Sequence, residues 1–78
     1  MMQLYLYTLG KTLYEGETSG VTLPAEGGEI GILPHHMPLV TSLKKGTLKL
    51  KAESGEQAFE IAGGFAYTDG EKLIVLAD

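Results

Sequence analysis

Hydrophobic and polar residues alternate with a period of two along much of the chain, which is typical of β-strands that bury one face. The clearest run spans residues 47–52, where Leu48 and Leu50 share one face and lysines occupy the other. Residues 53–56 are polar and contain a glycine, and residues 58–61 return to a β-rich pattern. The pattern therefore predicts a hairpin that pairs residues 47–52 with residues 58–61.

A second hairpin is indicated near the end of the sequence. Residues 65–68 and 72–76 are both β-rich, and Asp69-Gly70 lies between them. Asp-Gly favours a tight turn because that turn needs positive φ angles. Residues 73–76 are apolar on both faces. Such a strand is expected to be central in its sheet, or to be covered by something outside the chain.

The remaining segments also favour strands. Residues 3–8 and 18–23 read as strands separated by a turn at Gly10 and a short segment, and Pro24 with residues 26–28 then breaks the pattern. No window sustains the spacing of an amphipathic helix. We therefore predict one domain over residues 1–78, an all-β antiparallel two-sheet β-sandwich or flattened barrel.

Composition narrows the function classes. The 78 residues allow one domain with a thin core, and there is no cysteine to supply a disulfide or a thiolate ligand. The net charge is −4 and all six basic residues are lysines, which argues against binding to nucleic acid or anionic lipid. No run of about 20 apolar residues and no signal peptide is present. We expect a soluble chain that meets a membrane only through a partner.

Two motifs invite a binding role, and each has a simpler structural interpretation. Adjacent side chains such as His35 and His36 point to opposite faces of an extended segment, so they seldom bind one metal ion together. We expect a proline-flanked loop over residues 33–38 in which one imidazole makes a structural hydrogen bond. Residues 27–31 match no phosphate-binding fingerprint and are expected to form a tight turn.

No catalytic constellation is recognisable. Glu26, Glu29, Thr41 and Ser42 could supply an acid, a base and a nucleophile, but they show no triad spacing. We predict no catalytic residue, no metal site and no cofactor. The lysines between residues 44 and 51 form a local basic cluster, which is either a solvated face or a docking patch for an acidic partner. From the residues alone, the chain is a small binding or structural module.

Residues 28–41 carry a longer pattern: Gly-Glu, an aliphatic residue, Gly-Ile, Leu-Pro, a histidine at position 36, and Pro-Leu-Val-Thr. This run resembles a hallmark of the epsilon subunit of F-type ATP synthases. Residues 43–46, 61–66 and 75–78 are also similar to that family, so the resemblance covers essentially the whole chain. It departs at His35, where the family commonly has Gly, and at Met37, where Ala is common.

The resemblance implies a non-catalytic rotor subunit of the central stalk, which docks on the gamma subunit and the c ring and helps to couple proton translocation to ATP synthesis. It implies a peripheral position at the cytoplasmic face of the bacterial inner membrane, or on the equivalent organellar side. Family members typically continue into a C-terminal pair of helices, which we expect this chain to lack. ATP binding and inhibition of hydrolysis are attributed to those helices and are not assigned here.

The resemblance also assigns roles to individual residues. It places Glu29 and His36 at the c ring. It places a second set at the interface with gamma or the ring, consisting of Thr8, Met37, Pro38, Leu39 and Thr41. We expect outward-facing Tyr5 or Tyr7, together with Met37 and Leu39, to supply apolar area there. Two alternatives stay open: an unrelated β-sandwich module that binds ligands or peptides through the His35-His36 loop, and a small metal-dependent enzyme.

Overall fold

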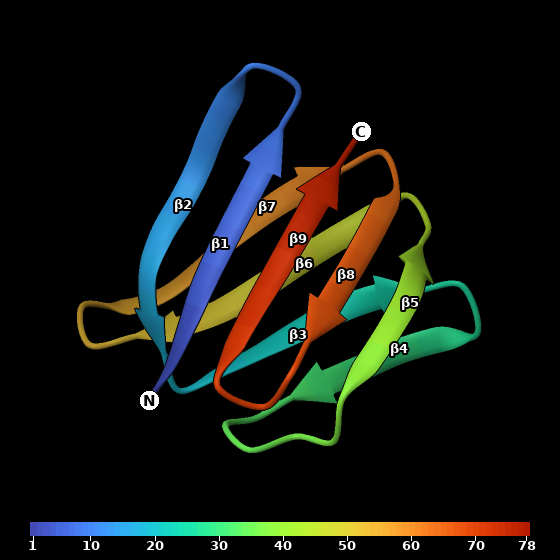
Figure 1. The fold of residues 1–78 in the computed structure, drawn as a ribbon. Coiled ribbons are helices and arrows are strands. Elements are labelled where there is room, and N and C mark those ends of the chain that lie inside the picture. Colours follow the sequence, from blue (N-terminus) through green and yellow to red (C-terminus); the bar gives the residue numbers. More distant parts are fainter.

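The computed structural model describes residues 1–78, which form nine β-strands and no helix (Figure 1). The strands are β1 (Met2–Thr8), β2 (Lys11–Thr18), β3 (Gly20–Ala25), β4 (Gly28–Ile32), β5 (Leu39–Leu43), β6 (Gly46–Ala52), β7 (Gly55–Ile61), β8 (Gly64–Thr68) and β9 (Lys72–Ala77). The all-β prediction is confirmed.

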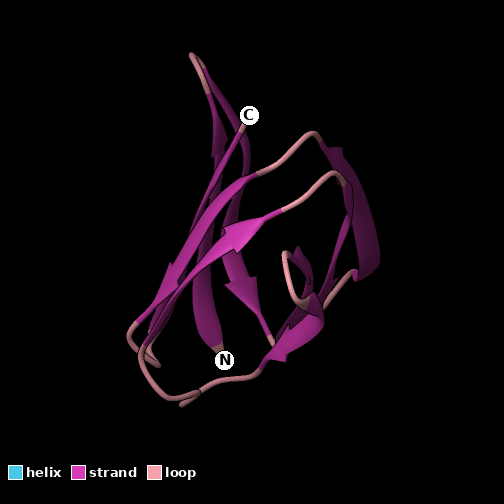
Figure 2. Ribbon diagram, turned by 90° about the vertical axis from the view of Figure 1, so that its right-hand side faces the viewer, coloured by secondary structure: helices cyan, strands magenta, loops and turns pink.

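The strands form a single sheet that curls strongly on itself (Figure 2). The hydrogen-bonded order is β2-β1-β9-β8-β5-β3-β6-β7, and β4 pairs with the free side of β3. One half consists of β2, β1, β9, β8 and β5, and the other of β4, β3, β6 and β7. A single pairing, Ala25 with Leu43, joins the two halves. The curl brings their inner faces together around one core.

The core is filled by alternate residues of both halves, as the period-two pattern requires. Leu4 and Val75 from one half, and Leu23 and Leu48 from the other, are fully buried. Buried polar side chains are few and hydrogen-bonded. The Thr18 hydroxyl lies 2.6 Å from the carbonyl oxygen of Lys51, and no buried side-chain nitrogen or oxygen lacks a partner. Burial of these side chains therefore leaves no donor or acceptor without a hydrogen bond.

Both predicted hairpins are confirmed. β6 pairs antiparallel with β7, and β8 pairs antiparallel with β9. The turn between β8 and β9 contains Gly70 at φ 97°. Its neighbour Asp69 accepts hydrogen bonds from the backbone N–H groups of Glu71 and Lys72, at 3.0 and 3.1 Å. These bonds hold the pKa of the Asp69 carboxyl below its usual value, because they stabilise the charged form.

Three expectations differ from the structure. Residues 11–18, expected as a turn and a short segment, form β2, which pairs along the whole of β1. Gly28–Ile32, expected within a tight turn, is strand β4, and the chain turns at residues 26–27 instead. The predicted antiparallel two-sheet arrangement is not confirmed, since the strands form one curled sheet in which β1 and β9 run parallel. β2 and β4 were not predicted as strands because both contain glycine, which usually marks turns or bulges.

One glycine is required by close packing. Gly64 begins β8 at φ +138°, where residues with a side chain are strained, and a Cβ there would overlap the carbonyl oxygen of Leu76. Phe65 pairs with Leu76 in the next register position. Gly64 thus lets the first residue of β8 lie close to the last residues of β9.

Candidate docking surface

The outer face of the β1-β9-β8-β5 half carries a continuous apolar surface, which we call the apolar face. Strand register arranges its side chains in two rows across the sheet. The first row runs Tyr7, Leu76, Phe65 and Ser42, and the second runs Tyr5, Ile74, Tyr67 and Val40. Neighbours in such rows stand about 5 Å apart. Seven of these eight positions are aromatic or aliphatic, so the two rows form one patch.

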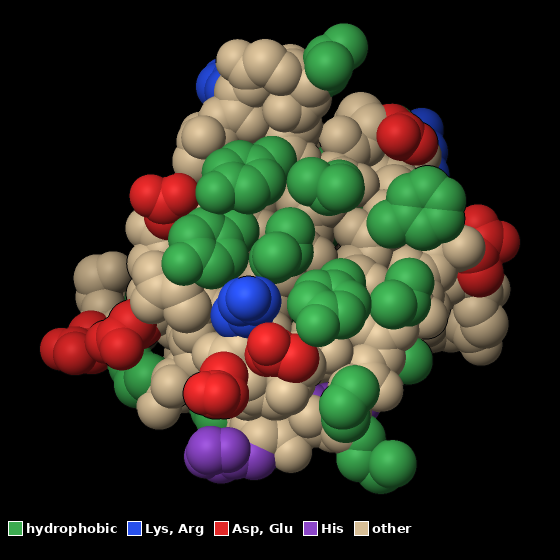
Figure 3. Space-filling model, in the orientation of Figure 1, with side chains coloured by type: hydrophobic (Ala, Val, Ile, Leu, Met, Phe, Trp, Pro, Cys, Tyr) green, Lys and Arg blue, Asp and Glu red, His purple; other side chains and the backbone are tan.

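This patch is open to solvent. Val40 is 70% exposed, Phe65 60% and Leu76 55%, and Figure 3 shows the hydrophobic side chains of this face gathered over β1, β9, β8 and β5. They surround a shallow hollow of about 280 Å³ lined only by hydrophobic residues. Single exposed hydrophobic residues are ordinary, but a contiguous patch of this kind marks an interaction surface.

The central strand of the patch explains the apolar run at residues 73–76. Leu73 and Val75 point into the core and are buried, whereas Leu76 points outward and is exposed. The expectation of a central strand is confirmed, since β9 lies between β1 and β8. Its outer side is uncovered in this chain, and a cover from outside the chain stays a prediction. The run therefore combines a core-forming face with a surface-forming face.

Tyrosines at one border of the patch are held in place by their neighbours. The rings of Tyr5 and Tyr7 stack with centroids 6.2 Å apart, and the Tyr7 hydroxyl donates a hydrogen bond of 3.1 Å to Glu15 on β2. Partial desolvation of the phenol, followed by this bond and the negative charge of Glu15, raises the pKa of Tyr7 above its usual value. The aromatic side chains are thus pre-positioned for contact.

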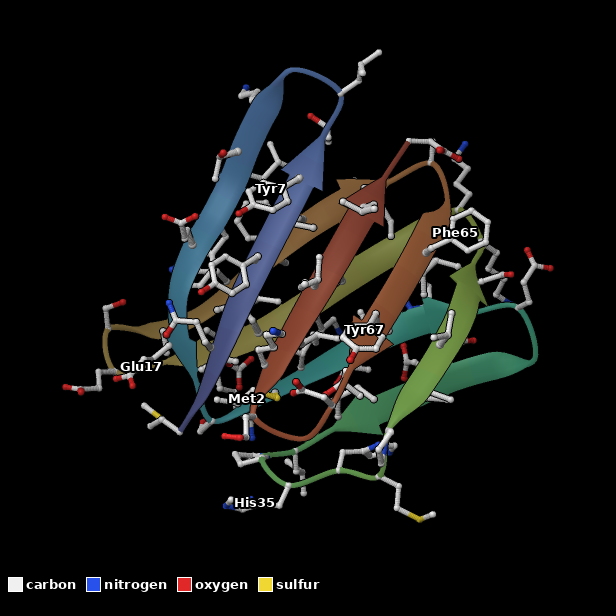
Figure 4. All side chains as sticks on the ribbon, in the orientation of Figure 1. Met2, Tyr7, Glu17, His35, Phe65 and Tyr67 are labelled. Atoms are coloured by element: carbon white, nitrogen blue, oxygen red, sulfur yellow. The ribbon has the colours of Figure 1, made fainter.

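The residues assigned by resemblance do not form one cluster. Glu29 is exposed on β4, on the other half of the sheet from the apolar face. Met37 and Pro38 are exposed in the loop that joins β4 to β5. Thr8 ends β1 and lines a hollow beside Leu76 and Phe65. In Figure 4 the loop, marked by His35, lies at the opposite end of the molecule from Tyr7.

Two of the assigned residues on β5 face inward. Leu39 is half-buried and packs against the core, and Thr41 is also half-buried. The expectation that Leu39 points outward is therefore wrong. Alternation along β5 places Val40 outward in its stead, and Val40 is among the most exposed apolar residues of the chain.

The histidine loop agrees with its structural interpretation. The His36 imidazole lies with Nδ1 2.7 Å from the carbonyl oxygen of Met37. His35 donates its backbone N–H to the Gly70 carbonyl oxygen at 2.7 Å and adopts φ 69°. No three His, Asp or Glu side chains converge as a metal site would require.

The chain contains no helix long and apolar enough to cross a membrane.

Several residues of the apolar face escaped prediction. Val40, Phe65, Tyr67 and Ile74 were not singled out, although Tyr5 and Tyr7 were. One signal was present, because a run that is apolar on both faces already pointed to an external cover. The fold and this surface define the class as a small all-β domain with an exposed apolar sheet face, of the kind that protein partners cover.

Comparison with known proteins then identifies the family. Residues 1–78 match the family model for the β-sandwich domain of the ATP synthase delta/epsilon chain, and the chain belongs to this family. It is 38% identical over 77 residues to the ATP synthase epsilon chain of Dichelobacter nodosus, covering 97% of this chain and 54% of the relative. It is also 38% identical over 78 residues to the epsilon chain of Bordetella petrii, covering 99% and 55%.

Solved structures share the same fold. A chain in the Euglena gracilis mitochondrial ATP synthase structure, which contains OSCP, F1 and the c-ring in rotational state 1, superposes with a TM-score of 0.90 at 25% identity. That match covers 97% of this chain and 49% of the other. The central stalk and c-ring of Tetrahymena thermophila mitochondrial ATP synthase include a chain of the same fold, with a TM-score of 0.80, 18% identity and coverage of 97% and 62%. The chain spans about half the length of the relatives it matches.

Proposed function

We propose that this chain is the β-sandwich part of a non-catalytic rotor subunit of a rotary ATP synthase, and that it docks on the gamma subunit through the apolar face. The observation that carries the proposal is the uncovered patch over β1, β9, β8 and β5. Membership of the delta/epsilon family supports it. So does the fold shared with chains of ATP synthase assemblies.

The shape of the domain suits a part that transmits torque. The two halves of the curled sheet act as the two layers of a sandwich, held by one close-packed core. Nine strands connected by short turns leave little of the chain in flexible loops. A stiff body of this kind moves as a unit, so rotation of the ring is passed to the stalk rather than absorbed by internal deformation.

The energetics favour the apolar face as the main dock. An exposed ion pair contributes only about 0–1 kcal/mol, so a single carboxylate such as Glu29 cannot hold the domain on a rotor. A stable interface buries about 800 Å² on each partner. Apolar area with aromatic anchors is the part of such an interface that supplies most of the affinity, and the apolar face provides three exposed or half-exposed tyrosines and Phe65.

The contact with the c ring falls elsewhere in this proposal. Glu29 on β4 and His36 in the following loop face the ring, and Met37 and Pro38 extend that contact. Thr8, Leu39 and Thr41 belong to the gamma side. Leu39 and Thr41 face inward and support Val40, which lies between them on β5 and makes the contact. The domain would thereby bridge two partners and couple proton translocation through the ring to ATP synthesis. It would be peripheral to the membrane, on the cytoplasmic face in bacteria or the equivalent organellar side.

Titration calorimetry of the chain with a gamma subunit from the same source tests the gamma contact. Val40→Asp places a charge in the patch and is expected to abolish binding, because the charge would be buried without a partner. Ala58→Asp places the same charge on exposed β7, outside the patch, and should leave binding intact. Binding that survives Val40→Asp, or that both variants lose equally, would contradict the assignment.

A further inference from the structure

The outer face of the other half of the sheet carries a second, chemically different feature. Register places Gly31, Thr22 and Lys49 in one row across β4, β3 and β6. Gly20 and Lys51 pair in the next row, and Lys51 pairs with Glu56 on β7. These rows surround a hollow of about 420 Å³ that is open to solvent, which we call the lysine groove.

The groove exists because its floor carries few and small side chains. A Cβ on Gly31 would meet no atom within 4 Å, and Thr22 is the only side chain between Gly31 and Lys49. Leu33 forms one wall and leans over Gly20, where a Cβ would approach the Leu33 methyl group to 3.0 Å. The exposed side chains of Lys49 and Lys51 form the opposite wall.

Neither lysine of this wall forms an ion pair, although Glu56 stands opposite Lys51 on β7 and also lines the groove. The one ion pair of the structure joins Lys72 to Asp69, so neither Lys49 nor Lys51 lies within bonding distance of a carboxylate, Glu56 included. The chain as a whole has a net charge of −4. With two lysines and one glutamate in its lining, the groove still carries a local excess of positive charge on an acidic chain, and Leu33 supplies an aliphatic wall opposite the lysines.

We propose that the lysine groove binds an extended acidic peptide segment of a partner protein, in which acidic and aliphatic side chains alternate. Alternate residues of an extended segment point to opposite sides, so its carboxylates would face Lys49 and Lys51 while its aliphatic groups face Leu33. Pockets for small molecules bury most of their ligand, whereas this hollow is open to solvent and its lining residues come from the neighbouring strands β4, β3 and β6, which suits a chain lying across those strands. The site does not use the apolar face, so it stands or falls independently of the gamma contact.

The test is a titration of the ¹⁵N-labelled full chain with the acetylated, amidated peptide Glu-Leu-Glu-Leu-Glu, followed by amide chemical shifts. We expect the largest shifts at Thr22, Gly31 and Lys49, and none over β1 and β9. Binding should weaken several-fold between about 0.05 and 0.3 M NaCl, because exposed charges are screened over that range. Shifts confined to other surfaces, or none up to millimolar peptide, would overturn the proposal.

Matched variants separate groove binding from general attraction. Gly31→Leu fills the floor and is expected to weaken binding at least tenfold. Gly27→Leu is the control, since Gly27 also has open space and no positive φ but lies at the β3–β4 turn. Neutralising both groove lysines (Lys49→Gln with Lys51→Gln) should weaken binding about three- to tenfold. The pair Lys44→Gln with Lys45→Gln removes the same charge outside the groove and should have little effect.

Two further outcomes count against the proposal. If inorganic phosphate at the same concentration shifts the same amides and competes with the peptide, the groove is a small-anion site rather than a peptide site. If Gly31→Leu and Gly27→Leu bind equally well while thermal unfolding shows both are folded, the floor plays no part. If Val40→Asp loses gamma binding but still shows the peptide-induced amide shifts, the apolar face and the lysine groove are separate binding surfaces.

Discussion

The contribution of Phe65 to docking can be estimated from its exposure. An aromatic side chain buries about 150–250 Å² when fully covered, and 60% of Phe65 is exposed in the free chain. Docking would then cover about 90–150 Å² of it, which at about 25 cal/mol/Å² corresponds to about 2–4 kcal/mol. Phe65→Ala is therefore expected to raise the Kd for gamma about 40- to 500-fold.

The matched control is Leu33→Ala, which removes a side chain of similar exposure, 63%, from the loop that follows β4, outside the apolar face. Calorimetry with gamma should show little change for this variant. Both variants should unfold at nearly the wild-type urea concentration, because neither side chain lies in the core. Equal affinities for gamma in Phe65→Ala and the wild type would refute the assignment of the apolar face.

Three further predictions concern the fold itself. His35→Gly should stabilise the chain by about 0.5–1 kcal/mol in urea unfolding, because φ 69° strains a residue with a side chain; an unchanged or lower midpoint would contradict this. Gly64→Ala should lower the free energy of unfolding by more than about 3 kcal/mol or prevent folding, since its Cβ would overlap the Leu76 carbonyl oxygen. The control Gly27→Ala has open space around its Cβ and should lower the free energy of unfolding by less than about 1 kcal/mol. Folding lowers the pKa of Asp69, so the charged carboxylate stabilises the fold above about pH 4. That contribution is lost as the pH falls through the pKa of the folded state. An NMR titration that gives Asp69 an unshifted or raised pKa in the folded chain would exclude this reasoning.

The parts of the fold that follow from local sequence were predictable. The run over residues 47–52 alternates cleanly and became β6, and the Asp69-Gly70 turn placed β8 against β9. β2 was missed because Gly16 and two glutamates interrupt its pattern. The parallel pairing of β1 with β9 joins the two ends of the chain. Such long-range pairing is set by the curl of the whole sheet, and no local pattern encodes it.

The candidate surface was only partly predictable for the same reason. Alternation tells which residues of a strand share a face, but a surface also depends on which strands are neighbours. Phe65 and Tyr7 are far apart in sequence and become near neighbours only because β9 lies between β8 and β1. At residues 39–41 the resemblance alone indicated the segment. The structure was needed to show that Val40, rather than Leu39, faces outward.

In the proposed function the apolar face lies against gamma in the assembled rotor. The most direct measurement is photo-crosslinking in the assembled synthase, with p-benzoylphenylalanine at position 67 in place of Tyr67, which lies in the middle of the second row. We expect a crosslink to gamma from this position, and none to gamma when the same probe replaces Ala58 on β7. A crosslink from position 67 to a c subunit, or no crosslink from an assembled and active complex, would contradict it.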